Sequence, residues 1–133
     1  MLELRSQKNS IRQGDVGVAI AIAWFAQNGY PPLKPLTENL PYDLGVDMGD
    51  KICRVQVRTT YHKNKAGNYE VHLRVLGGNR SGTGLTTYFD PAKVEYLFVV
   101  TEIGEKYLIP STDIMCKSTI TLCDEKYAQY RVE

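Results

Sequence analysis

Asp43, Gln56 and Arg58 are three polar residues near the middle of the chain whose side chains could act together on a phosphate. Carboxylate and amide oxygens are hard ligands of the kind that Mg²⁺ takes, and a guanidinium pairs well with phosphate oxygens. A divalent ion held in this way would polarise a phosphodiester and lower the pKa of an attacking water. These residue types could therefore carry metal-assisted chemistry on a phosphate, provided that the fold brings the three side chains together.

The residues that must position these side chains form a predicted β-hairpin. Between residues 41 and 60, apolar side chains alternate with polar or small ones, and residues 48–51 make a short loop. In the register that this loop favours, Asp43 lies opposite Gln56, with Arg58 two residues further along the same face. The same register predicts two apolar pairs on the other face, Leu44 with Val55 and Val46 with Cys53.

This arrangement resembles the metal site of the PD-(D/E)XK nuclease superfamily. That site has an Asp at the start of one strand and, on the partner strand, a Glu or Gln, any residue and a Lys. The matching residues here are Pro41-Tyr42-Asp43 and Gln56-Val57-Arg58. The Gln form followed by two threonines looks most like the branch of group I intron-encoded homing endonucleases. The resemblance runs from about residue 8 to the end of the chain, in the order helix, hairpin, long strand and Tyr-Leu-Ile-Pro strand.

The resemblance implies a fold and an activity. The expected fold is α/β (α+β), with a mixed central sheet of about five strands flanked by helices, as in restriction endonucleases. The expected activity is that of a metal-dependent endodeoxyribonuclease of the homing or restriction type. It would use Mg²⁺, with Mn²⁺ as a substitute, and would act on double-stranded DNA as a homo-oligomer, a dimer or a tetramer.

The resemblance also implies roles for individual residues. Asp43, the Gln56 side chain and the main-chain carbonyl of Val57 would be the metal ligands. Arg58 stands where the family has its catalytic Lys. An arginine can stabilise charge on the phosphate, but it stays protonated and cannot act as a base. We therefore expect activity below that of a lysine-bearing relative by ~10²-fold.

Asp15 is a further candidate for the catalytic site. Relatives often carry an acid on the first helix in a Gly-Asp-x-Gly-Glu run, whereas this chain has Gly14-Asp15-Val16-Gly17-Val18, with Val18 at the Glu position. Residues three apart share a helical face, so Asp15 could serve instead. The alternative is that Asp15 only stabilises the positive N-terminus of the helix.

Basic residues near the hairpin form a predicted nucleic-acid-binding surface. The net charge is only +1, so such a surface must come from local clustering. The candidates are Arg54, His62, Lys63, Lys65, Arg74 and Arg80. Lys63, Lys65 or His62 could also reach the attacking water in place of the missing lysine. Contact with phosphate and plain solubility are the alternatives for all three.

Composition limits the remaining possibilities. A chain of 133 residues predicts a single domain, 1–133, with an ordinary hydrophobic content of 43%. Three cysteines without CxxC spacing indicate reduced thiols in a cytoplasmic protein and argue against a zinc site.

The apolar run Val16–Ala26 is shorter than the ~20 residues that cross a bilayer. It predicts a helix, apolar nearly all round and packed on more than one side, that ends at Asn28-Gly29.

The second half of the chain predicts further strands at 69–75, 96–100 and 106–110, the middle one buried on both faces. A short helical turn is expected at 113–115. Tyr127 and Tyr130 would lie on one face of a helical tail docked on the sheet. The glycine-rich run 77–84 lacks the GK[ST] of a phosphate-binding P-loop and is interpreted as a loop that carries Arg80.

Three other functions stay open on the sequence alone. One is a catalytically impaired nucleic-acid-binding module that kept the nuclease fold. Another is an enzyme similar to a Holliday-junction resolvase. In the third, the protein is a structural or interaction domain, and Asp43, Gln56 and Arg58 are only a cross-strand polar network.

Overall fold

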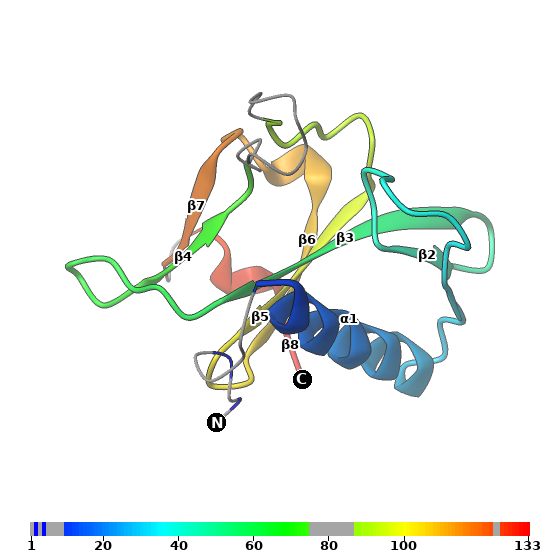
Figure 1. Ribbon diagram of the computed structural model, residues 1–133, viewed down its shortest axis with the longest axis horizontal. Coiled ribbons are helices and arrows are strands. Elements are labelled where there is room, and N and C mark those ends of the chain that lie inside the picture. Colours follow the sequence, from blue (N-terminus) through cyan, green and yellow to red (C-terminus); the bar gives the residue numbers. More distant parts are fainter. Residues whose placement is uncertain (1, 3, 5–9, 75–86, 124–125) are drawn as a thin grey trace.

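The computed structural model describes residues 2, 4, 10–74, 87–123 and 126–133 (Figure 1). Its elements in chain order are α1 Ser10–Gln27, β1 Pro32–Leu33, β2 Leu44–Asp47, β3 Ile52–Thr60, β4 Tyr69–His72, β5 Tyr96–Thr101, β6 Lys106–Pro110, η1 Ser111–Asp113, β7 Thr119–Leu122, η2 Ala128–Tyr130 and β8 Arg131–Val132. None of the helices among these residues is long and apolar enough to cross a membrane. The predicted Arg80 loop and Val75 lie outside the described residues.

The main sheet has six strands in the order β1-β2-β3-β5-β6-β8, and a second sheet pairs β4 with β7. Only the pair β3–β5 is parallel among the strands described, so the main sheet is mixed. The predicted mixed α+β fold is therefore confirmed, with six strands in place of about five. The strand predicted at 69–75 ends at His72 and belongs to the second sheet rather than to the main one.

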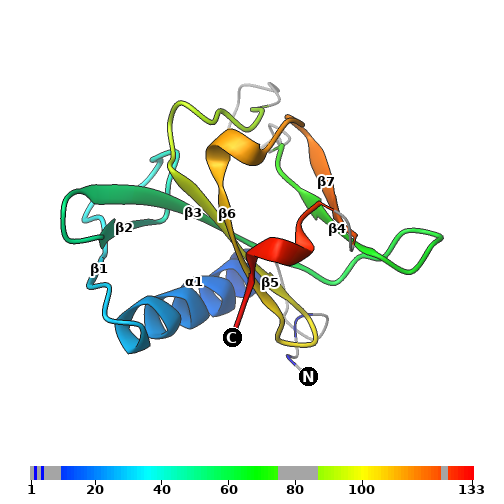
Figure 2. The same cartoon turned by 180° about the vertical axis from the view of Figure 1, so that it is seen from behind.

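The two faces of the main sheet are covered by different layers (Figures 1 and 2). Helix α1 covers one face, where Phe25 and Trp24 pack on Phe98 and the valines of β3. The other face packs against β4 and β7 through a separate apolar cluster that includes Val71, Ile120 and Val99. Because neighbouring residues of a strand point to opposite faces, each residue of β3 faces either the helix or the second sheet.

Helix α1 ends as its sequence predicts. Gly29 has a φ of 81°, and its amide donates to the carbonyl of Ala26. The buried residues Gly17, Ala21, Trp24 and Phe25 fall on one face of the helix. The prediction that the helix packs on more than one side is therefore wrong for the described residues, since its other faces are exposed or only partly covered.

The hairpin has the predicted register. Leu44 pairs with Val55 and Val46 pairs with Cys53. Cys53 is buried, and burial raises the pKa of its thiol, as expected of a small core residue rather than a nucleophile. Strand β2 begins at Leu44, so Asp43 is the residue that leads into it.

The C-terminal tail differs from its prediction only in local form. The expected short helical turn is a 3-10 helix that starts two residues earlier, at Ser111. The helical tail is a single 3-10 turn at Ala128–Tyr130, and the chain then continues as strand β8. Tyr127 and Tyr130 both pack on the core cluster of β4 and β7, so the expected docking on the sheet layers holds.

Gly17 lets the helix approach β3 closely. A Cβ atom at this position would lie 2.6 Å from Cγ2 of Thr59 and 3.2 Å from Cγ1 of Val57. We expect Gly17→Ala to lower the free energy of unfolding by roughly 1–2 kcal/mol, because overpacking outweighs the gain in helix propensity. Gly14→Ala is the matched control, since nothing lies within 4 Å of its Cβ position. Denaturant unfolding should show that this control stabilises the protein by about 0.5–1 kcal/mol; equal effects of both would contradict the close approach.

Candidate active site

Asp43 is bonded to β3 just beyond the residues that pair with β2, on the side of β3 that faces away from β5. This part of the strand is called the edge of β3 below. Its amide donates to the carbonyl of Val55 at 2.9 Å, which continues the pairing of β2 with β3 by one residue. Its carboxylate Oδ2 then accepts a hydrogen bond from the amide of Val57 at 2.8 Å. The Asp43 carboxylate thus accepts a main-chain hydrogen bond from β3 that a residue of β2 would otherwise accept.

The main-chain carbonyl of Val57 points to the same edge of β3. In a strand, the N–H and C=O of one residue point to the same neighbour. Since the Val57 amide bonds to Asp43, its carbonyl lies on the side of the Asp43 carboxylate rather than on the side of β5. Two oxygen donors, one of them charged, therefore meet at this edge.

Arg58 lies beside these two oxygens. Its Nη1 donates to the carbonyl of Val57 at 3.2 Å. Burial lowers the pKa of the Arg58 guanidinium, and the charge of the Asp43 carboxylate partly offsets this. A guanidinium stays protonated at neutral pH in either case, so Arg58 brings a fixed positive charge to the edge.

Gln56 and Arg58 point to the face of the sheet away from α1. Both line a small hollow of about 70 Å³ whose other walls include Leu73, Phe89 and Lys93. Asp43 instead lines a larger hollow of about 390 Å³ formed by the loop that precedes β2. The structure thus brings Asp43, Val57 and Arg58 together, and it places Gln56 with Arg58 in the neighbouring hollow.

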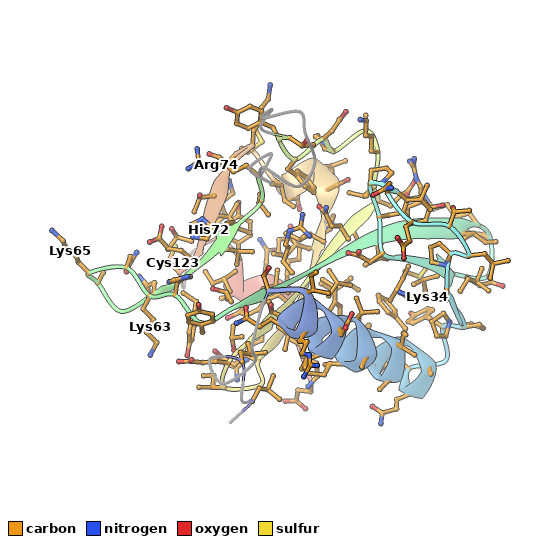
Figure 3. All side chains as sticks on the ribbon, viewed as in Figure 1. Lys34, Lys63, Lys65, His72, Arg74 and Cys123 are labelled. Carbon is orange, nitrogen blue, oxygen red and sulfur yellow. The ribbon has the colours of Figure 1, made fainter. Side chains whose placement is uncertain are left out.

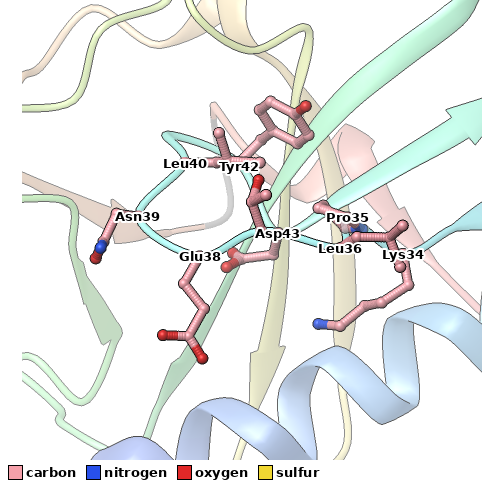
Figure 4. A pocket seen from close by; sticks show the side chains of 9 residues that line it. Lys34, Pro35, Leu36, Glu38, Asn39, Leu40, Tyr42 and Asp43 are labelled. Atoms are coloured by element: carbon pink, nitrogen blue, oxygen red, sulfur yellow. The ribbon is translucent and has the colours of Figure 1, made fainter.

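Two further charged residues line the hollow of Asp43. They are Lys34 and Glu38, which lie on the same loop (Figure 4). From the sequence, Glu38 lies five residues before Asp43 and could approach the site on a loop, with a solvated loop residue as the favoured alternative. It is exposed and also borders the hollow. Lys34 was not predicted. The loop conformation that places both residues on the wall of this hollow has no periodic pattern from which it could be predicted.

Asp15 is exposed near the start of α1. It precedes by two residues the point where Gly17 meets Val57 and Thr59, but it is not among the residues that line the hollow of Asp43. Its catalytic role stays a prediction.

The oxygen donors at this edge suit a magnesium site better than a closed transition-metal site. No group of three His, Cys, Asp or Glu side chains within the described residues could hold a metal ion. Mg²⁺ does not need such a group, because it commonly uses one or two carboxylates and keeps several waters or phosphate oxygens. Asp43 and Val57 supply one carboxylate and one carbonyl oxygen at this edge, and Gln56 lines the neighbouring hollow; the first two fit an open site of this kind, and the part of Gln56 stays a prediction.

The predicted nucleic-acid-binding residues divide into two groups. Arg54 has a protein partner, because its Nη2 pairs with Oε1 of Glu95 at 3.0 Å and its amide also bonds to that carboxylate. The hydrogen bonds from Arg54 hold the pKa of Glu95 below its usual range. Its contact with nucleic acid stays a prediction.

Of the other described candidates, Lys63, Lys65 and Arg74 lie on one side of the molecule (Figure 3). Lys63 and Lys65 are exposed on the loop after β3, and Arg74 is exposed just beyond β4. His62 is also exposed, stacks on Tyr61 and meets the ring of His72 edge-on. None of these residues lines the hollow of Asp43 or that of Arg58, so nothing in the structure supports the idea that they replace a catalytic lysine.

Comparison with known proteins agrees with this fold. No curated protein matches the chain. A solved structure described as that of a bacterial homing endonuclease, I-Ssp6803I, superimposes with a TM-score of 0.75 at 24% sequence identity, covering 92% of this chain and 88% of that one. At this identity the likeness shows the fold alone. Residues 8–132 match the PD-(D/E)XK endonuclease family, whose members typically use divalent metal ions. The chain therefore belongs to the PD-(D/E)XK endonuclease family.

Proposed function

We propose that this protein is a metal-dependent endodeoxyribonuclease, of the homing or restriction type, that cleaves double-stranded DNA with Mg²⁺ or Mn²⁺. The observation that carries the proposal is the edge of β3, where the Asp43 carboxylate bonds to the Val57 amide beside the Val57 carbonyl. One charged and one neutral oxygen at the same open edge can share a hard cation.

The chain's own groups have separate tasks in this proposal. Asp43 and the Val57 carbonyl, with the Gln56 amide oxygen, would hold the divalent ion. When bound, that ion polarises the scissile phosphate and lowers the pKa of a water. Arg58 would pair with phosphate oxygens and stabilise the charge that develops on them. Lys34, in the hollow of Asp43, offers a second cation to the DNA backbone.

Plasmid nicking tests the proposal. The protein should nick supercoiled DNA in Mg²⁺ or Mn²⁺, and a chelator should abolish the nicking. Binding of DNA without metal and without any nicking would instead support the second candidate, an impaired nucleic-acid-binding module. The specific observation that favours this candidate is Arg58 at the family's lysine position. Faster cutting of four-way junctions than of linear duplex would indicate a resolvase-like enzyme.

The exposed basic residues beyond β3 would hold the DNA backbone. We expect the double variant Lys63→Gln, Lys65→Gln to bind duplex more weakly and to reduce the slope of log affinity against log salt by about 1–2, because each lost phosphate contact removes ~0.9. Lys51→Gln is the matched control, since this exposed lysine lies in the loop at the opposite end of β3. Anisotropy titrations at several salt concentrations measure the slopes; unchanged slopes in the double variant would remove these lysines from the DNA surface.

A domain of this size covers a short stretch of duplex, so cleavage of both strands would need two or more copies. We propose a symmetric homo-oligomer, a dimer or a tetramer, whose symmetry matches that of its target. Sedimentation with and without duplex tests the stoichiometry. A monomer on a cleaved duplex would contradict the assembly without affecting the chemistry.

A further inference from the structure

We propose that the Arg58 side chain competes with the divalent ion for the Val57 carbonyl, so that metal binding to the DNA-free protein is held weak. The inference rests on the proposed function, because it takes the Asp43 edge of β3 as the metal site. It adds to the proposed contact between Arg58 and phosphate a regulatory role for Arg58 in metal binding.

The competition follows from where the guanidinium lies. Nη1 of Arg58 is 3.2 Å from the carbonyl oxygen of Val57, the same oxygen that would face the cation. The Asp43 carboxylate, bonded to the amide of Val57, contributes the negative charge that favours the protonated Arg58. A guanidinium in this position already supplies the positive charge that the two oxygens attract. A second cation must displace it or bind against its repulsion.

Arg58 is held loosely enough to be displaced. Within the described residues its hydrogen-bond acceptor is one main-chain carbonyl. Arg54, on the same strand, is tied instead by two carboxylate oxygens of Glu95 and by the carbonyl of Ala92. Arg58 is also only partly buried, and it borders the hollow that it shares with Gln56, which leaves room for another position.

A DNA phosphate would be the stronger partner for this guanidinium. A guanidinium can pair with two phosphate oxygens at once, and the phosphate adds an attraction between opposite charges that the neutral carbonyl of Val57 lacks. A phosphate that reached the edge of β3 would therefore draw Arg58 away from the carbonyl of Val57 and free that oxygen for the metal. Metal and DNA would then each raise the affinity for the other, because such coupling is reciprocal. The protein would load its metal mainly when its substrate is present.

Mn²⁺ titration of the DNA-free protein, followed by electron paramagnetic resonance, tests the competition without any measurement of activity. We expect Arg58→Gln to lower the Kd for Mn²⁺ by ~10-fold, the effect of removing one charged hydrogen-bond competitor. Arg58→Met repeats the test with a different neutral side chain. Lys93→Gln is the matched control, because it removes the same charge from a residue of the same hollow that does not bond to Val57. Its Kd should stay within about twofold of the parent, as expected for a screened, exposed charge.

The possible outcomes separate the inference from the proposed function. Equal Mn²⁺ affinities for the parent, Arg58→Gln and Arg58→Met, all lost with Asp43→Asn, would overturn the competition and leave the metal site standing. An equal gain in Lys93→Gln would also overturn it, because general charge would then be the cause. Mn²⁺ binding that is unaffected by Asp43→Asn, alone or combined with Arg58→Gln, would instead contradict the proposed metal site.

Discussion

Asp43→Asn is expected to reduce metal-dependent plasmid nicking by about 10²–10³-fold, the scale seen when one preorganised charge-stabilising group is lost. Asparagine has nearly the same shape, and its amide oxygen can still accept the hydrogen bond from the Val57 amide. The fold of the hairpin should therefore survive, while the only charge among the three proposed ligands disappears. Initial rates in Mg²⁺ and Mn²⁺, with thermal melting as a check on folding, measure the effect.

Glu38→Gln is the matched control for this prediction. Glu38 lines the same hollow as Asp43 but is exposed and lies on the loop rather than at the edge of β3. We expect it to reduce nicking far less than Asp43→Asn does. Equal cutting by the parent and by Asp43→Asn would mean that the activity comes from a different site or from a contaminant.

Arg58→Lys is expected to raise the nicking rate by ~10²-fold, since it introduces the lysine that the resemblance to PD-(D/E)XK nucleases implies for this position. A lysine can lose a proton and can help to deprotonate a water, which a guanidinium cannot do. It also lacks the planar fork of the arginine that bonds to the carbonyl of Val57. Single-turnover rates at saturating metal isolate the chemical step from any change in metal affinity.

Arg54→Lys makes the same substitution four residues earlier on β3, where the guanidinium pairs with Glu95. This control should not increase the rate. If Arg58→Lys is no faster than the parent, the absent lysine does not limit the rate, and another group, such as Lys34 in the hollow of Asp43, would have to supply its function.

The features predicted best from sequence were those with a regular pattern. Alternation along residues 41–60 and a short loop were sufficient for the register of β2 with β3, and hence for the place of Asp43 opposite the start of Gln56-Val57-Arg58. The helix was bounded by Asn28-Gly29, where Gly29 does adopt a positive φ. In both cases a local physical rule determines the outcome, and distant residues have little influence on it.

Features without a period were missed. Strands β1 and β8 have two residues each, too few to show any alternation, and they form only because a neighbouring strand offers an edge. Strand β7 pairs with β4, which is far from it in sequence. An irregular loop places Lys34 on the wall of the hollow that Asp43 lines, and the bond from Arg58 to the carbonyl of Val57 depends on one rotamer. Pattern rules do not determine such details.

The central claim is that Asp43 and the Val57 carbonyl bind one divalent ion at the edge of β3. The most direct measurement is an anomalous difference map from crystals soaked in Mn²⁺ at concentrations high enough to displace Arg58. Our account predicts a peak at coordination distance from both the Asp43 carboxylate and the Val57 carbonyl oxygen, with the Arg58 guanidinium moved away. A peak elsewhere, or an empty edge with Arg58 still bonded to Val57 at saturating Mn²⁺, would contradict it.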